Sequence, residues 1–251
     1  MSRQLSIVVP AFDEAARLPA TLERILGHYA GSSELLEVLI ADDGSRDGTL
    51  EVAEAFARRD PRVRVLSADR HRGKGAAVRQ GILASRGEFV LFSDADLATP
   101  IEDAEALWAA IEAGASVAIG SRAVPGAEVV KLQPWYRKAS GPVLRGLLRL
   151  LGLGGIRDTQ CGFKLFDGAV ARQLFAMQRV EGFAFDLETL YLARREGLRI
   201  DEVPVRWFDN DDSRVRFFRD SARLLFDMVR IRLGRYPEPR PAAQPDRAAA
   251  G

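Results

Sequence analysis

The feature that most constrains the fold is a regular alternation of short apolar runs and amphipathic segments along residues 1–122. The apolar runs are rich in β-branched residues and lie at 5–10, 38–41, 62–66, 89–93 and 116–120. The amphipathic segments lie between them, at about 15–29, 48–59, 74–86 and 101–113. Runs that are apolar on both faces are typical of strands covered by helices on both sides. The pattern therefore predicts an α/β fold with a mostly parallel, right-handed, doubly wound central sheet.

The alternation ends after residue 122, and the second half of the chain predicts a C-terminal, largely helical elaboration. We expect a loop over 123–140, a short helix over 141–152, a strand at 163–166, helices at 168–177 and 186–196, a strand at 200–207 and an arginine-rich helix at 214–235. No clean linker separates the halves, so residues 1–236 are interpreted as one domain. The tail, residues 237–251, is of low complexity and is expected to be disordered.

The charge balance and the cysteine content narrow the class of protein. The 36 basic and 35 acidic side chains give a net charge of +1, so no global charge draws the molecule to nucleic acid. The single cysteine, Cys161, excludes an internal disulfide and fits a reducing compartment. No run reaches the roughly 18 apolar residues that span a bilayer. The longest, 143–153, is interrupted by Arg145 and Arg149. We expect a protein that is soluble or lies on a membrane surface.

Polar clusters follow each of the five predicted strands of the first half. They read PAFDE (10–14), ADDGSRDGT (41–49), SADRHRGKG (67–75), SDADLATP (93–100) and GSR (120–122). Open α/β sheets bind ligands at the carboxyl ends of their strands. Since all five clusters are predicted at such ends, we expect them to converge on one functional site.

Four carboxylates in these clusters point to a cation. Asp42, Asp43, Asp94 and Asp96 are predicted near one edge of the sheet, where unpaired carboxylates repel one another. Carboxylate ligands without histidine or cysteine partners favour Mg²⁺ or Mn²⁺ over zinc. Because Mg²⁺ usually completes its shell with water and phosphate, the Asp-x-Asp pattern suggests a metal that holds a diphosphate. The alternative interpretation is a solvated polar turn.

The sequence Arg72-Gly73-Lys74-Gly75 opens the third predicted helix. Small residues at a helix N-terminus, with two cations beside them, favour an anion. The alternative is an ordinary flexible basic turn, since neither the Walker A pattern nor GxGxxG is present. Asp47 is expected to cap the second helix.

These strings, in this order and at these spacings, resemble the inverting glycosyltransferases of the GT-A (nucleotide-diphospho-sugar transferase) fold. GIRDTQCGFKLF (155–166), FAFDLETLY (183–191) and PVRW (204–207) narrow the resemblance to the dolichyl-phosphate β-glucosyltransferases and their prokaryotic polyprenyl-phosphate relatives. It covers about residues 4–235. It implies a nucleotide-sugar-binding half at 1–122 and an acceptor-binding half at 123–236.

The resemblance also implies roles for individual residues. The expected donor contacts are Pro10, Phe12, Glu14, Asp42, Asp43, Arg72, Lys74, Asp94 and Ala95. The expected metal ligands are Asp96 and Asp94, with Mg²⁺ or Mn²⁺ as the cofactor. The mannosyl-transferring relatives carry a glutamine where this chain has Ala98, so a third side-chain ligand is absent, whereas the DADxAT form fits the glucosyl branch.

On the acceptor side, the expected phosphate contacts are Arg122, Arg137 and Ser140. Gln160, Phe185 and Glu188 are expected around the sugar and the acceptor. The expected catalytic residues are Asp96, Asp186 and Arg122.

The implied reaction is a displacement with inversion that moves a hexose, by resemblance glucose from UDP-glucose, onto a dolichyl or undecaprenyl phosphate. A phosphate monoester is already largely dianionic at neutral pH, so it needs no general base. Asp186 is therefore expected to orient the sugar rather than to remove a proton. Two alternatives stay open: a transferase of the same fold with a soluble or polysaccharide acceptor, and a non-catalytic nucleotide-sugar-binding protein.

A lipid acceptor requires the enzyme at a membrane. In the segment 214–235, apolar residues recur at helical spacing with arginines between them, as in a helix lying in an anionic bilayer interface. A core-packing helix with a solvated arginine face is the alternative, and 143–153 has the same ambiguity. We expect a cytoplasmic protein attached peripherally at the cytoplasmic face of a membrane.

Overall fold

The computed structural model of the chain describes residues 3–130, 146, 149, 152, 154–208 and 217–237. The main strands are β1 (Leu5–Ala11), β2 (Leu35–Asp42), β3 (Val63–Ser67), β4 (Phe89–Ser93), β5 (Val117–Ser121), β7 (Phe163–Asp167) and β8 (Ile200–Pro204). The helices are α1 (Leu18–His28), α2 (Thr49–Arg59), α3 (Lys74–Ala84), α4 (Ala104–Glu112), α6 (Gly168–Met177), α7 (Phe185–Arg195) and α8 (Phe217–Leu233), with a 3₁₀ turn, η1 (Ile101–Asp103).

Within the described ranges, seven strands form one sheet in the order β3-β2-β1-β4-β7-β5-β8. The pairs β1–β2, β2–β3, β1–β4 and β5–β8 are parallel, whereas β7 is antiparallel to both β4 and β5. The mostly parallel sheet flanked by helices is therefore confirmed, including the five strands predicted in the first half.

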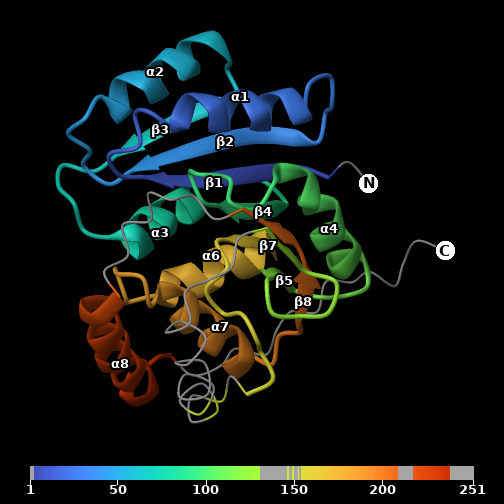
Figure 1. Cartoon of the computed structure of the whole chain (residues 1–251), viewed down its shortest axis with the longest axis vertical. Coiled ribbons are helices and arrows are strands. Elements are labelled where there is room, and N and C mark those ends of the chain that lie inside the picture. Colours follow the sequence, from blue (N-terminus) through green and yellow to red (C-terminus); the bar gives the residue numbers. More distant parts are fainter. Residues whose placement is uncertain are drawn as a thin grey trace.

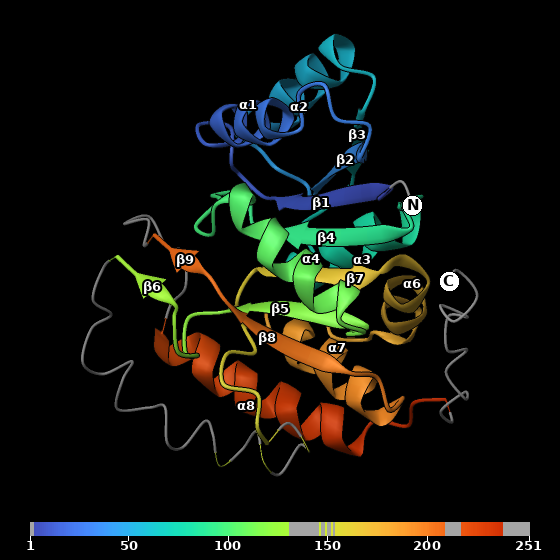
Figure 2. The ribbon, with the colours of Figure 1, turned by 90° about the vertical axis from the view of Figure 1, so that its right-hand side faces the viewer.

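Helices cover both faces of the sheet, and each face has its own apolar core (Figure 1 and Figure 2). One core includes residues of α1, α2 and α4 and the strand residues that face them. The other includes residues of α3, α6, α7 and α8. Coverage on both faces explains why the strands are apolar throughout rather than alternating.

Two details of the second half differ from the prediction. The expected strand at 200–207 is divided into β8 and the short β9 (Arg206–Trp207), which pairs with β6 (Glu128–Val129) in a separate two-stranded sheet. The strand at 163–166 is confirmed as β7, but its insertion between β4 and β5 depends on long-range pairing that no local pattern shows.

Helices α6, α7 and α8 confirm the predictions for 168–177, 186–196 and 214–235 within a few residues. The helix expected over 141–152 and the tail after residue 237 lie outside the described residues, as does most of the loop 123–140. Where the structure describes the chain, no helix is long and apolar enough to cross a membrane.

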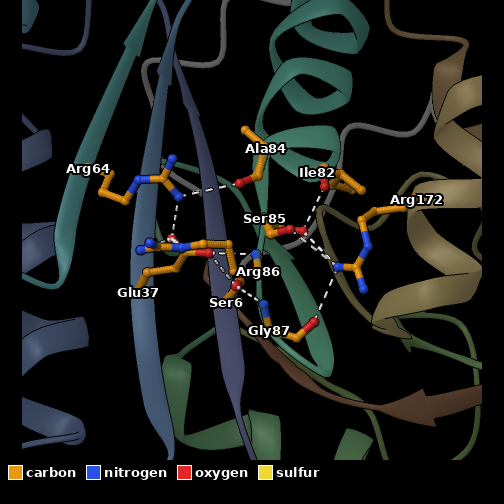
Figure 3. Close-up of polar contacts among 9 residues, drawn as sticks. All are labelled: Ser6, Glu37, Arg64, Ile82, Ala84, Ser85, Arg86, Gly87 and Arg172. Atoms are coloured by element: carbon orange, nitrogen blue, oxygen red, sulfur yellow. Dashed lines mark hydrogen bonds and ion pairs between the residues drawn. The ribbon is translucent and has the colours of Figure 1, made fainter.

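A buried carboxylate fixes the edge of the sheet opposite the strand carboxyl ends (Figure 3). Glu37, near the start of β2, is fully buried. It accepts hydrogen bonds from Ser6 Oγ at 2.8 Å, Arg64 Nη1 at 2.5 Å and Arg86 N at 2.7 Å. Ser6 Oγ in turn accepts a hydrogen bond from Gly87 N at 2.8 Å. Glu37 therefore joins β1, β2 and β3 to the loop that leads into β4.

We predict that Glu37→Ala lowers the free energy of unfolding by about 2–4 kcal/mol, because it leaves buried donors without an acceptor. Burial alone would raise the pKa of Glu37, but the hydrogen bonds from Arg64, Ser6 and Arg86 bring it below its ordinary value. The stabilisation is therefore present above the ordinary pKa of Glu37 and is lost as the pH falls through its lower folded-state pKa.

Urea denaturation at neutral and at acidic pH measures both effects. The matched control is Glu54→Ala, which removes an exposed carboxylate of α2 and is expected to change stability by no more than about 0.5 kcal/mol. Equal stabilities for the two variants would contradict the role of Glu37.

Candidate active site

Two lysine–aspartate pairs lie over the ring of Phe92 at the carboxyl edge of the sheet. Lys74 Nζ is 2.6 Å from Asp94 Oδ1, and Lys164 Nζ forms an ion pair with Asp186 Oδ1. Both ammonium groups face the Phe92 ring, at 5.3 Å and 5.7 Å from its centroid. The four charged residues come from the start of α3, the position after β4, the start of β7 and the first turn of α7. The fold thus brings together residues that lie far apart in the sequence.

The second of these pairs is fully enclosed. Lys164 and Asp186 are 1% and 4% exposed, and Lys164 Nζ also donates a hydrogen bond to Cys161 O at 2.7 Å. Burial raises the pKa of Asp186, while the Lys164 and Lys74 charges oppose that rise. Both carboxylate and ammonium are costly to bury alone, so each depends on the other. Asp186 is therefore fixed in place rather than free to accept a proton.

Lys74 is more accessible and carries the positive charge of the site. Burial lowers its pKa, but the Asp94 and Asp186 carboxylates outweigh this and raise the pKa above its ordinary value. Lys74 thus stays protonated at neutral pH. A fixed ammonium beside partly exposed carboxylates is suited to a phosphate-bearing ligand.

The turn that carries Asp94 and Asp96 is held tightly. Asp94 N donates to Gly162 O at 3.0 Å, and Ala98 N donates to Asp96 Oδ1 at 3.0 Å. Leu97 has a φ of 45°, a left-handed conformation that costs a bulky residue about 1–3 kcal/mol. A Cβ at Gly162 would lie 2.0 Å from Asp94 Oδ2. The site is therefore built around a fixed position of the Asp94 carboxylate.

Asp96 is the residue that fits a metal ion best. Burial, and after it the neighbouring Asp94 carboxylate, raise the pKa of Asp96. Among the described residues, no group of three or more histidine, cysteine, aspartate or glutamate side chains is placed to hold a metal. Mg²⁺ takes only one or two protein carboxylates when phosphate and water supply the rest. The residues therefore fit a cation shared with a bound diphosphate.

Asp43 positions the basic loop. Its carboxylate accepts hydrogen bonds from Arg72 N at 2.9 Å and Gly73 N at 2.7 Å, and lies 2.8 Å from His71 Nδ1. Asp43 is 2% exposed. It thus holds the loop that carries Lys74, and its nucleotide contact stays a prediction.

The glycines of the Arg72–Gly75 sequence are explained by packing. A Cβ at Gly73 would lie 2.5 Å from Glu181 O, and one at Gly75 would lie 2.6 Å from Phe185 Cβ. Ala76 N, in the first turn of α3, donates to Glu181 O at 3.1 Å. The helix N-terminus is thus partly covered by residues 181–182, so the expected anion cradle is reduced to the side of Lys74. The guanidinium of Arg72 forms an ion pair with Glu181.

An aromatic pair lies at the ends of β1 and β3. The rings of Phe12 and His71 are 4.0 Å apart between centroids and tilted by 32°. The side chain of His71 is 53% exposed. Nearby, Asp42 is buried and lies within 3.3 Å of Ser45 N and Ser67 Oγ. Phe12, a predicted donor contact, therefore packs against His71, a loop histidine that the sequence alone did not single out.

The other two expected donor contacts from PAFDE are placed as follows. Pro10 is buried within β1. Glu14 forms a bidentate pair with Arg17 Nε at 2.7 Å and Nη2 at 3.0 Å.

Ala95, the last expected donor contact, is 7% exposed, and its carbonyl accepts a hydrogen bond from Thr21 Oγ1 at 2.5 Å. Asp47 supports the start of α2 as predicted, because its carboxylate accepts from Thr49 N at 3.1 Å.

Arg122, in the loop after β5, is paired with a residue that sequence reasoning missed. Its Nε and Nη2 donate to the two oxygens of Asp158 at 2.6 Å and 2.8 Å, and its backbone N donates at 3.0 Å. The guanidinium carbon lies 5.2 Å from the centroid of the Trp207 ring. Burial opposes the charge of Arg122, but Asp158 raises its pKa well above the ordinary value. The third guanidinium nitrogen of Arg122, Nη1, makes no hydrogen bond to a residue that the structure describes.

Lys164 could have been found from the sequence, because a charged residue inside the otherwise apolar predicted strand 163–166 requires a buried partner. Asp158, before that strand, carries no such signal. The partners themselves, Asp186 and Arg122, cannot be read from the local sequence.

Two expected acceptor residues have structural roles instead. Phe185 is 1% exposed and packs against Phe92, with 5.6 Å between ring centroids. Glu188 is fully buried and accepts hydrogen bonds from Val180 N at 2.7 Å and Tyr236 Oη at 2.6 Å. Residues two apart on a helix face different sides, so Asp186 and Glu188 do not share a site.

The other three expected acceptor contacts, Gln160, Arg137 and Ser140, stay predictions. Gln160 is exposed. Arg137 and Ser140 lie outside the described residues, as does most of the segment 143–153.

The chain is similar to proteins of a known family. The model of the family described as glycosyl transferase family 2 matches residues 6–175. The dolichyl-phosphate beta-glucosyltransferase of Drosophila melanogaster is 40% identical over 230 residues, covering 86% of this chain and 71% of that protein. The Homo sapiens protein of the same name is 36% identical over 245 residues, covering 92% and 76%.

Solved structures show the same fold at lower identity. The crystal structure of glucosyl-3-phosphoglycerate synthase from Mycobacterium tuberculosis in complex with phosphoglyceric acid has a TM-score of 0.70 and 19% identity, covering 92% of this chain and 80% of that chain. The same enzyme in complex with Mn²⁺, uridine-diphosphate and phosphoglyceric acid also has a TM-score of 0.70, at 18% identity and with coverage of 92% and 79%. The predicted GT-A fold is thereby confirmed.

We predict a strong energetic coupling between Lys164 and Asp186. Lys164→Met and Asp186→Leu are each expected to lower the free energy of unfolding by about 3–5 kcal/mol, because each leaves one buried charge unpaired. The double variant is expected to lose at least about 1 kcal/mol less than the sum of the two. Chemical denaturation of all four proteins gives the coupling energy.

The matched control is a double-mutant cycle on Glu54 and Arg58, an exposed pair on α2 at 3.8 Å, for which the coupling is expected to be close to zero. Additive effects at Lys164 and Asp186 would show that the buried pair does not act as a unit.

Proposed function

The chain belongs to glycosyl transferase family 2 and is a glycosyltransferase, and from this premise we propose that it transfers glucose with inversion from UDP-glucose to a dolichyl-type polyprenyl phosphate, using Mg²⁺ or Mn²⁺. The observation that carries the proposal is the arrangement of Lys74, Asp94 and Asp96 beside the enclosed Lys164–Asp186 pair. The names of the relatives support the choice of sugar and acceptor.

On the donor side, we propose that the ring pair of Phe12 and His71 contacts the uracil base and that Asp42 lies beside it. Lys74 is proposed to bind the diphosphate, since its ammonium is charged and partly exposed. Asp96 would hold the cation, which supplies Lewis-acid stabilisation of the departing diphosphate when it is bound. A preorganised ammonium at this position lowers the barrier because it needs no rearrangement as charge develops.

On the acceptor side, the lipid phosphate is its own nucleophile. It is largely dianionic at neutral pH, so attack at the anomeric carbon requires no proton transfer. This agrees with the state of Asp186, whose carboxylate is enclosed with Lys164 and is proposed to fix the sugar-facing wall of the site. Arg122 is proposed to bind an acceptor phosphate oxygen through Nη1, while Asp158 holds the rest of the guanidinium. Gln160, Arg137 and Ser140 remain proposed acceptor contacts.

We predict that the purified chain forms an organic-extractable glucolipid from UDP-glucose, dolichyl phosphate in detergent and Mn²⁺. The measurement follows radiolabelled glucose into the lipid phase and released UDP in the aqueous phase. Parallel reactions replace the donor with other UDP- or GDP-sugars, and the acceptor with undecaprenyl phosphate, phosphoglycerate or a free sugar. Transfer to soluble acceptors but to no polyprenyl phosphate would contradict the proposal, as would UDP release without any glycosylated product.

The control for the site is Asp96→Ala, which is expected to lower the transfer rate by at least about 100-fold through loss of the metal ligand. Asp201→Ala, at the opposite end of the sheet in β8, removes a carboxylate of the same size and is expected to leave the rate within about twofold. Near-normal metal-dependent transfer by the Asp96 variant would remove Asp96 from the metal site.

A further inference from the structure

The outward face of α8 carries an apolar stripe that nothing described in the structure covers. Phe226, Val229 and Leu233 are 68%, 58% and 75% exposed, and Leu225 is 46% exposed. On the opposite face, Met228 and Ile231 are buried in the core shared with α7. The helix therefore has two apolar faces, of which only one packs against the protein. The core-packing interpretation of this segment explains the inner face alone.

Arginines border the exposed stripe on both sides. Successive helical residues are about 100° apart, so Leu225, Val229, Leu233 and Phe226 together span an arc of about 100°. Arg232 lies just beyond one border of this arc and Arg230 just beyond the other, and both are exposed. Between residues 224 and 237, the exposed side chains include no aspartate or glutamate, because the one acid there, Asp227, is buried.

We propose that this face of α8 docks on an anionic lipid surface, with the apolar stripe entering the bilayer interface and the arginines contacting phosphate headgroups. An apolar arc bordered by cations is the pattern of a helix lying in the plane of a membrane interface. Each arginine near an anionic leaflet adds to the attraction. The choice of a membrane over another occupant rests on this charge complementarity and on the proposed function, since a lipid-linked acceptor is reached only at a membrane.

The position of α8 fits this role. Helix α8 lies at the end of the molecule opposite α1 and α2 in both views (Figure 1 and Figure 2).

A chain of hydrogen bonds fixes α8 relative to the active site. Tyr236, just after the helix, donates from Oη to Glu188 at 2.6 Å, and Glu188 also accepts from Val180 N at 2.7 Å. Gln178 Nε2 donates to Val180 O at 2.7 Å and to Gly75 O, next to Lys74, at 2.9 Å. The docked helix therefore holds the Lys74 loop at a set orientation to the membrane.

The test is flotation of the full chain with vesicles of phosphatidylcholine and phosphatidylglycerol, compared with vesicles of phosphatidylcholine alone. The unmodified protein is expected to bind the anionic vesicles more tightly, and binding is expected to weaken with salt. Phe226→Asp with Val229→Asp is expected to weaken binding at least about tenfold, because it places two charges in the stripe. Arg230→Glu with Arg232→Glu keeps the stripe and is expected to weaken binding to the anionic vesicles by a similar factor.

The matched control is Arg58→Glu with Arg59→Glu on α2, at the other end of the molecule (Figure 1), which makes the same charge change and is expected to leave vesicle binding within about twofold. Circular dichroism confirms the fold of each variant. Absence of binding by the unmodified protein, or binding by either α8 variant that equals that of the unmodified protein, would overturn the proposal. So would a dimer in sedimentation velocity that the stripe variant abolishes without any vesicle binding, since the face would then join two copies of the chain.

Glucose transfer to dolichyl phosphate in detergent separates this proposal from the proposed function. The α8 variants are expected to keep transfer within about twofold in detergent, where no bilayer is required, and to lose it on vesicles in proportion to binding. Vesicle binding without transfer to any lipid phosphate would refute the proposed function and leave the docking surface in place. Transfer to dolichyl phosphate in detergent without vesicle binding would support the proposed function and refute the docking surface.

Discussion

The buried pair of Lys164 and Asp186 is the interaction on which the active-site side of the molecule depends. It joins β7, inserted antiparallel between β4 and β5, to the first turn of α7. Because an isolated charge cannot stay buried at this depth, neither residue has an alternative position. Lys164 and Lys74 both face the Phe92 ring, and Gly162 limits the position of Asp94. The enclosed pair therefore fixes the part of the site next to the more exposed side chains of Lys74 and Asp94.

Asp186, Asp158 and Asp43 are each held by a partner within the protein, so they fix the geometry of the site. In the proposed function, Lys74 and Asp96 act on a donor diphosphate and its cation. An acceptor that is already ionised needs no general base, which agrees with the enclosed state of Asp186.

Much of the fold and the location of the site could be predicted from the sequence, because strand–helix alternation is local and the carboxyl ends of parallel strands share one edge. The individual roles were harder to predict. Phe185 and Glu188 were expected near substrate, but Phe185 packs in the core and Glu188 holds the 179–180 turn. Asp43 holds the Arg72–Gly75 loop, which the sequence did not predict. Each of these roles depends on a partner distant in the sequence. Gly73 and Gly75 follow the same rule, since the backbone they admit belongs to residues 180–182. A lysine inside an apolar strand signals a buried partner, but the sequence does not show which residue that partner is. Lys164 was therefore overlooked, and its partner is Asp186.

The central claim is that Asp96 and a donor diphosphate hold the cation together. Titration calorimetry of Mn²⁺ into the full chain, with and without saturating UDP, tests it most directly. With so few protein carboxylates available, Mn²⁺ is predicted to bind at least about tenfold more tightly when UDP is present, and this gain is predicted to disappear in Asp96→Ala. Equal Mn²⁺ affinity with and without UDP, or an undiminished gain in the Asp96 variant, would contradict the account.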